Sequence, residues 1–377
     1  MIKDEEITFI VTGKIFYNKN ITLKSLKSIK KYFPSSTIIL STWEDENTNE
    51  LEQFCNKIIK NKPLTKHISA CLPECDWYPK YNSYNSQQLS VSTALKICNT
   101  KYVVRLRSDF ILTKKSFLNY YNFYKNLLPH SSTIFKDKII IYSCGTINPF
   151  CDVLPLPQHP SDLFFFGLRE DLCEIYNGNF IPDEIANYYS KNKDKTNPCL
   201  FNHLYTPEQY LWLQTLDNKK VNYKKPLNYY DIDETIKEET LKFFIDNFII
   251  LDSKQIGIIS KFDKKFTAQK ANKQFITNLK FIEFCKNRYS NIHIDQLYKQ
   301  ELLYTNLEIL KSGCLKHFNA LLKNLCNTFS EFISTIFYMF KFLFYCSFYI
   351  IKIFYKINHK ILRVFHPNKN FYSKINK

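Results

Sequence analysis

Three charged side chains alternate at the end of one predicted strand, in the run Arg105-Leu106-Arg107-Ser108-Asp109. Because side chains along a strand alternate between its two faces, Arg105, Arg107 and Asp109 are predicted to share one face. Charged groups on a buried strand need partners. A carboxylate at this position could hold a divalent metal against a donor pyrophosphate. The alternative is an Arg–Asp ion pair that closes the edge of the sheet.

Two acids in the second half of the chain are candidates for a catalytic base. Asp162 follows a turn-like His-Pro-Ser sequence and precedes the apolar run 163–166, a predicted strand. Glu208 lies in Thr206-Pro207-Glu208-Gln209, which predicts the capped start of a helix. Either carboxylate could remove the proton from an attacking hydroxyl. An acid in a first helical turn is also favoured by the helix dipole, without any catalytic role.

Two histidines are weaker candidates for chemistry. His159 and His203 both lie in predicted loops. An isolated loop histidine is more often a hydrogen-bonded or solvated residue than a catalytic one. The non-catalytic interpretation is therefore favoured for both.

The elements that must position these residues alternate between strand and helix. Predicted strands cover residues 7–11, 37–41 and 102–106, and predicted helices cover 20–34, 47–55 and 85–98. This order predicts an α/β, Rossmann-like fold with a mostly parallel sheet flanked by helices. Ligands of such sheets bind beyond the carboxyl ends of the strands. The candidate donor-binding residues are therefore Thr12, Gly13, Trp43, Glu44, Arg105 and Arg107.

The composition excludes several classes of protein. The chain has 377 residues, of which 45% are hydrophobic, so it can bury a core and is not disordered. No leader-like apolar segment opens the sequence, and its 12 cysteines are interpreted as reduced thiols of a cytoplasmic protein. The net charge of +17 indicates an anionic partner. Nucleic acid is disfavoured because no nucleic-acid-binding motif is found.

The C-terminal part differs from the rest and is predicted to form a second region, 301–377, after a catalytic domain at 1–300. From residue 332 onward the sequence holds eight Lys or Arg and no acid, and it is strongly aromatic. Lys341 interrupts an apolar stretch that would otherwise be long enough to cross a bilayer. At helical spacing the polar residues form one narrow stripe. We therefore expect an amphipathic helix on an anionic membrane surface, at the cytoplasmic face of the inner membrane. A core helix and a true span are the alternatives.

The chain resembles the WavE family of lipopolysaccharide synthesis proteins over about residues 7–252. The blocks that carry the resemblance are 7–15, 22–34 running into 39–44, 85–95, 101–110, 161–167 and 207–210. The most specific are Leu106 to Asp109, Asp162 to Gly167 and Pro207-Glu208-Gln209. The resemblance implies a GT-A-like fold and a glycosyltransferase of surface polysaccharide synthesis. The expected partners are a nucleotide-sugar donor and a lipid-linked saccharide acceptor.

The resemblance also implies roles for single residues. Asp109 corresponds to the metal-binding acid of an Asp-x-Asp-like motif, which implies Mg²⁺ or Mn²⁺, although Arg107 replaces the first acid. A guanidinium there could itself neutralise a phosphate. Asn85 and Gln87 are further donor-binding candidates, with a serine between them where the family pattern has a basic residue.

The same resemblance favours Glu208 as the base and Asp162 as its partner on the acceptor side, because the base of GT-A enzymes usually lies on a helix that lines the acceptor site. An inverting transfer would need such a base. The incomplete Asp-x-Asp pattern leaves an alternative. The chain could instead be a non-catalytic, membrane-associated assembly or sugar-binding factor for polysaccharide synthesis.

Overall fold

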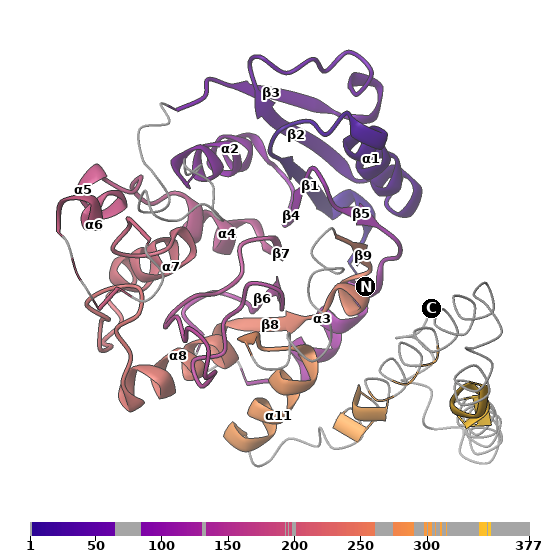
Figure 1. The fold of residues 1–377 in the computed structure, drawn as a ribbon. Helices are drawn as coiled ribbons and strands as arrows, with labels where there is room; N and C mark the ends of the chain where they lie inside the picture. The colour runs from indigo at the N-terminus through magenta and orange to yellow at the C-terminus, as the bar shows by residue number, and fades with distance from the viewer. Residues whose placement is uncertain are drawn as a thin grey trace, which may run out of the picture. The chain divides into compact units, whose positions relative to one another are not determined.

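The computed structural model describes residues 2–64, 84–129, 133–192, 194, 196–197, 201–260 and 274–289, with short stretches between 298 and 347. The chain divides into two compact units, Met1–Ile292 and His293–Lys377. Unit 1 contains every strand that the described residues form (Figure 1). Most of the predicted amphipathic tail lies outside the described residues. Within the described ranges, every helix is too short or too polar to span a bilayer.

A mixed sheet of seven strands forms the centre of unit 1. Its order is β3-β2-β1-β4-β7-β6-β8. The strands are β1 (Ile7–Thr12), β2 (Thr37–Trp43), β3 (Lys57–Asn61), β4 (Tyr102–Arg107), β6 (Ile139–Tyr142), β7 (Phe164–Leu168) and β8 (Phe248–Leu251). All neighbours pair in parallel except that β7 is antiparallel to both β4 and β6. The prediction of an α/β fold with a mostly parallel sheet is confirmed. A second sheet pairs β5 (Ile111–Leu112) with β9 (Ile258–Ile259).

Helices flank the sheet on both sides (Figure 1). The longer helices are α1 (Ile21–Tyr32), α2 (Tyr84–Ile97), α3 (Ser116–Leu127), α4 (Arg169–Tyr176), α7 (Pro207–Asn218), α8 (Glu234–Asn247) and α11 (Asn278–Arg288). Short helices are α5 (Asp183–Ala186), α6 (Tyr188–Lys191) and α9 (Ser253–Ile256), with 3-10 turns at Asp4–Glu6, Asn18–Asn20 and Glu52–Phe54. Helix α7 packs on α4, which in turn contacts β4 and β7.

The predicted elements of the first third are confirmed with one exception. The helix predicted over 47–55 is wrong, because this segment forms turns and the short 3-10 helix Glu52–Phe54. The strand β3 that follows was not predicted. Its only two apolar residues are adjacent and lie between two lysines, and it lies at the edge of the sheet with exposed or half-buried side chains before Asn61. Edge strands bury little surface, so their hydrophobic pattern is weak.

The two faces of β4 have different environments. In its register with β7, Val104 lies opposite Phe166 and Arg105 lies opposite Phe165. Phe166 packs in an aromatic layer against Phe117 of α3, with ring centroids 4.9 Å apart. Phe165 instead packs edge-on against a tyrosine of α4. Arg105 therefore lies on the side of the sheet that α4 and α7 cover.

Candidate functional site

The carboxyl ends of β1, β2 and β4 come together as predicted. The Ser108 backbone nitrogen donates to the Thr12 carbonyl oxygen at 3.0 Å, and the Gly13 nitrogen donates to Ser41 at 3.2 Å. The Ser108 hydroxyl donates to the carbonyl oxygen of Lys14 at 2.7 Å. Gly13 has a φ of +116°, and a Cβ there would lie 3.2 Å from the Ser108 hydroxyl oxygen. Glycine is therefore needed at this turn.

Arg107 and Asp109 form a bidentate ion pair at this edge. Arg107 Nε and Nη2 donate to the two Asp109 carboxylate oxygens at 2.9 and 3.0 Å. The Asp109 side chain is 3% exposed and the Arg107 side chain 26% exposed, so the guanidinium is the accessible partner. This is the ion pair that the sequence left open as an alternative.

A metal centre is not formed by these residues alone. Among the described residues, no group of three or more His, Cys, Asp or Glu side chains gathers in a way that could hold a metal ion. The Asp109 oxygens are already neutralised by Arg107. The residues present thus do not fit the predicted metal ion, and metal dependence stays an untested prediction.

The other donor-side candidates occupy different surroundings. Trp43 is half-buried and Glu44 is exposed, with the Glu44 backbone nitrogen bound to the Asn61 carbonyl oxygen at 3.0 Å. The Asn85 amide is engaged twice by the Ile181 backbone, at 3.0 and 2.8 Å. This contact fastens α2 to the segment before α5, which the sequence did not indicate. Gln87 is half-buried on α2, and donor binding by these four residues remains untested.

Helix α7 begins as the sequence predicted, and it presents Glu208 in its first turn. Thr206 is the N-cap, its hydroxyl accepts from the Gln209 nitrogen at 3.2 Å, and the Gln209 amide oxygen accepts from the Thr206 nitrogen at 3.0 Å. The Glu208 side chain is 24% exposed. It therefore stays partly accessible while its helix is fixed.

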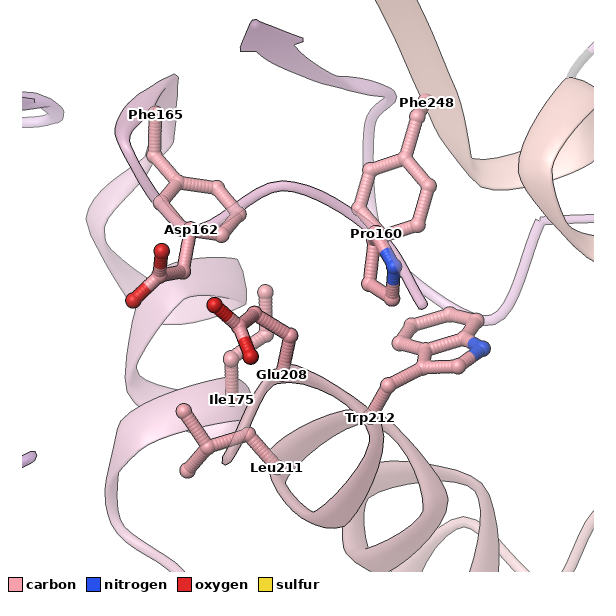
Figure 2. A pocket seen from close by; sticks show the side chains of 8 residues that line it. All are labelled: Pro160, Asp162, Phe165, Ile175, Glu208, Leu211, Trp212 and Phe248. Atoms are coloured by element: carbon pink, nitrogen blue, oxygen red, sulfur yellow. The ribbon is translucent and has the colours of Figure 1, made fainter. Parts of the chain in front are cut away.

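Glu208 and Asp162 line the same small, mostly apolar pocket. The lining residues are Pro160, Asp162, Phe165, Ile175, Glu208, Leu211, Trp212 and Phe248 (Figure 2). Figure 2 shows the two carboxyl groups next to each other on one side of this pocket. The cavity measures about 10 Å³, close to the space that a single water molecule needs.

The surroundings of Glu208 favour its protonated form. Burial, together with the nearby charge of Asp162, raises the pKa of Glu208 to about 8, although Arg105 and the Thr206 hydroxyl act in the opposite direction. A carboxyl group with this pKa is mostly neutral at pH 7 and can gain or lose a proton near neutrality. This behaviour is typical of catalytic acids and bases.

His159 lies beside Glu208. Its Nε2 lies 3.5 Å from Glu208 Oε2, and its Nδ1 lies 2.9 Å from the Gly145 carbonyl oxygen. Because a carbonyl only accepts, Nδ1 carries the hydrogen and Nε2 of the neutral ring presents a lone pair to Glu208. Burial lowers the pKa of His159 to about 4, so the ring is neutral near pH 7.

His203 and Gln158 complete the buried polar surroundings. His203 Nδ1 lies 3.0 Å from the Tyr84 hydroxyl, and burial lowers the pKa of His203 to about 3. Gln158 accepts from Trp212 Nε1 at 2.8 Å and has a positive φ of 51°. Gln158 was missed by sequence reasoning. Its partner lies 54 residues away, and no local pattern announces such a contact.

Arg105 contacts the segment that carries Asp162, whereas Arg107 pairs with Asp109. The Arg105 side chain is 1% exposed, and its Nη1 donates to the Asp162 carbonyl oxygen. In the register of β4 with β1, Arg105 and Arg107 lie two positions apart, in agreement with the prediction that they share a face. Their partners nevertheless differ, and the predicted contact of Arg105 with a donor remains untested.

A family model for WavE lipopolysaccharide synthesis matches residues 7–312. The chain belongs to the WavE family. The match includes Arg105, Asp109, Asp162 and Glu208, and it extends beyond residue 252, where the resemblance found in the sequence stopped. No curated protein matches this WavE chain.

Several solved structures match the WavE chain at low identity. S. aureus TarS is 9% identical with a TM-score of 0.33, over 80% of this chain and 42% of TarS. The glycosyltransferase GlyE of Streptococcus pneumoniae is 10% identical with a TM-score of 0.28, over 56% of this chain and 43% of GlyE. The 4-diphosphocytidyl-2C-methyl-D-erythritol synthase of Anaerococcus prevotii is 11% identical with a TM-score of 0.28, over 63% of this chain and 94% of the synthase. The chain thus spans less than half of TarS and of GlyE, and at these TM-scores the likeness carries no argument about activity.

Proposed function

We propose that this WavE-family chain is a glycosyltransferase of lipopolysaccharide or capsule biosynthesis. It transfers a sugar from a nucleotide-sugar donor to a lipid-linked saccharide acceptor. The observation that carries the proposal is the partly accessible Glu208 carboxyl, whose pKa of about 8 and whose neighbour Asp162 suit proton transfer. Membership in a lipopolysaccharide synthesis family supports a saccharide acceptor of this class.

In the proposed inverting reaction, Glu208 acts as the general base. An acceptor hydroxyl gives its proton to the ionised Glu208 carboxylate while its oxygen forms a bond to the anomeric carbon of the donor sugar. The bond from that carbon to the nucleoside diphosphate breaks at the same time, and its electron pair leaves with the phosphate oxygen. Asp162 holds the acceptor beside Glu208, and the neutral His159 ring accepts a hydrogen bond when Glu208 is protonated.

The donor diphosphate is proposed to lie at the carboxyl ends of β1 and β4. Arg107 is the more accessible member of its ion pair with Asp109, so its guanidinium can turn toward a diphosphate while Asp109 keeps it at the edge of the sheet. A guanidinium matches phosphate oxygens in geometry and charge. No step of this mechanism requires a metal ion.

Attachment to a membrane surface remains part of the proposal. Helical residues 339–344 of unit 2 include Met339, Phe340, Leu343 and Phe344, whose exposed fractions range from 47% to 70%. The sequence around them is basic and lacks acids from residue 332 onward. Exposed aromatic and aliphatic side chains beside lysines suit an anionic bilayer surface. Removal of residues 332–377 should release folded protein from membranes, whereas resistance of the full chain to alkaline carbonate would indicate a span.

A transfer assay tests the proposed function against the non-catalytic alternative. The purified full chain is incubated with labelled nucleotide sugars and membranes from a strain that lacks the gene. We expect label from one donor to enter the glycolipid fraction with release of nucleoside diphosphate. If the deletion shortens the surface polysaccharide but no donor is ever consumed, the chain is an assembly or sugar-binding factor and not a transferase.

A further inference from the structure

Arg105 is a buried cation that forms no ion pair with any of the described residues. Its side chain is 1% exposed, Nη1 donates to the Asp162 carbonyl oxygen, and Nε has no hydrogen-bond partner among the described residues. A buried charge that is not paired costs several kcal/mol after relaxation. We therefore expect the charge of Arg105 to have a role that a neutral side chain at this position would not fulfil.

Near pH 7 the ionisable groups around Arg105 and Glu208 reduce to one cation and two carboxyl groups. Burial lowers the pKa values of His159 and His203, which leaves both rings neutral. Burial raises the pKa of Tyr176, whose hydroxyl therefore keeps its proton. What remains is the Arg105 cation together with the Asp162 and Glu208 carboxyl groups, and both Arg105 and Asp162 act electrostatically on Glu208.

We propose that Arg105 is a positioning residue, which supplies the counter-charge that lowers the pH at which Glu208 ionises and which holds the Asp162 backbone beside Glu208. Two neighbouring carboxylates repel each other, so one of them keeps its proton unless a cation compensates. A protonated Glu208 cannot accept the acceptor proton. The consequence for catalysis rests on the proposed function, whereas the electrostatic coupling can be measured without any substrate.

The test uses the stability of the full chain as its readout. Free energies of unfolding in urea are measured from about pH 5 to about pH 10.5 for the protein and for Glu208→Gln, and the difference between the two curves reports the ionisation of Glu208. The same pair is then measured with Arg105→Met and with Arg107→Met as backgrounds. Arg107 is the matched control, since it lies on the same strand two residues away but pairs with Asp109.

In the Arg105→Met background, the midpoint of Glu208 ionisation should move upward by about 1–3 pH units. In the Arg107→Met background it should stay in place. An unchanged midpoint with Arg105→Met, or an equal displacement with Arg107→Met, overturns the proposal. A purely structural role for Arg105 would lower stability by the same amount at every pH and leave the midpoint where it is.

Arg105→Lys keeps the proposal testable if Arg105→Met does not fold. The amine retains the charge, so the midpoint should stay within about half a pH unit of the unmodified chain. An upward displacement of one unit or more with the charge retained would contradict the proposal. Because no sugar transfer is involved, a chain that shows this coupling but transfers nothing would refute the proposed function alone.

Discussion

Two arginines lie two residues apart on one face of β4, yet only one of them forms an ion pair with a neighbouring acid among the described residues. Arg107 makes a bidentate pair with Asp109 and remains 26% exposed, whereas Arg105 is buried beside two carboxyl groups and pairs with neither. The first arrangement neutralises an acid locally. The second leaves an acid, Glu208, with a pKa of about 8 because burial and Asp162 outweigh the cation.

The difference indicates where proton transfer and where charge recognition take place. In the Arg107–Asp109 pair at the carboxyl end of β4, Arg107 can exchange the carboxylate for a phosphate. The guanidinium can form two parallel hydrogen bonds with either group. An acid that is held near neutrality inside an apolar pocket can take up and release a proton. The following substitutions break one region while leaving the other intact.

The largest effect is expected from Glu208→Gln. Loss of the base should lower kcat by about 10²–10⁴-fold while the KM for the donor changes little, because shape is kept and only the charge is lost. Steady-state transfer kinetics at several donor concentrations provide the measurement. Glu184→Gln, which alters an exposed acid in the first turn of α5, is the matched control and should behave like the unmodified chain. A larger loss with Asp162→Asn would exchange the roles of Asp162 and Glu208.

A smaller but still large effect is expected from Asp109→Asn. The substitution removes one carboxylate oxygen from the pair with Arg107, so most transfer activity should be lost, mainly through a rise in the KM for the donor of about tenfold or more. The fold should persist, as measured by circular dichroism. Full activity of this variant in the presence of Mg²⁺ or Mn²⁺ would contradict a role of Asp109 in donor binding.

The substitution Glu208→Gln should lower activity but raise the free energy of unfolding at high pH. The pKa of this carboxyl rises from 4.5 to about 8 on folding, so the folded chain holds the proton more tightly than the unfolded chain. The contribution of Glu208 to stability is thus fully present below about pH 4.5 and is lost as the pH rises toward 8. Glu208→Gln should therefore be more stable than the unmodified chain at pH 8.5, by about 4–5 kcal/mol, with a difference below about 1 kcal/mol at pH 5. Urea denaturation at the two pH values is the check, and equal differences would contradict the raised pKa.

The smallest effect is expected from Glu44→Gln. The side chain is exposed at the end of β2, so stability should change by less than about 0.5 kcal/mol. If Glu44 contacts the nucleoside, the KM for the donor rises while kcat is retained. An unchanged KM would remove Glu44 from the donor site and leave Trp43 to be tested separately.

Local patterns were sufficient for much of the fold and for one part of the site. The capped start of α7 was predicted residue by residue from Thr206 to Gln209, because each cap contact spans only three positions. The gathering of the β1 and β4 ends followed from strand alternation and parallel pairing. Edge strand β3 was missed because its side chains are largely exposed, which leaves little hydrophobic pattern to recognise.

The pocket that Asp162 and Glu208 line was only partly predictable, since its contacts join segments that are distant in the sequence. The sequence singled out Asp162 and Glu208 separately but gave no sign that Arg105 would contact the backbone of Asp162, which lies 57 residues away. The strand period placed Arg105 and Arg107 on one face correctly. The strand period could not show that Arg107 would pair with the nearby Asp109, or that Arg105 would be buried on the side of the sheet that α4 covers.

The most direct test of the central claim is the pH dependence of kcat/KM for the acceptor, since this ratio reports the ionisation of the free enzyme. If ionised Glu208 is the base, kcat/KM should rise about tenfold per pH unit below about pH 8 and level off above it. A profile that is flat from about pH 6 to about pH 9, or that falls over this range, would contradict Glu208 as the base.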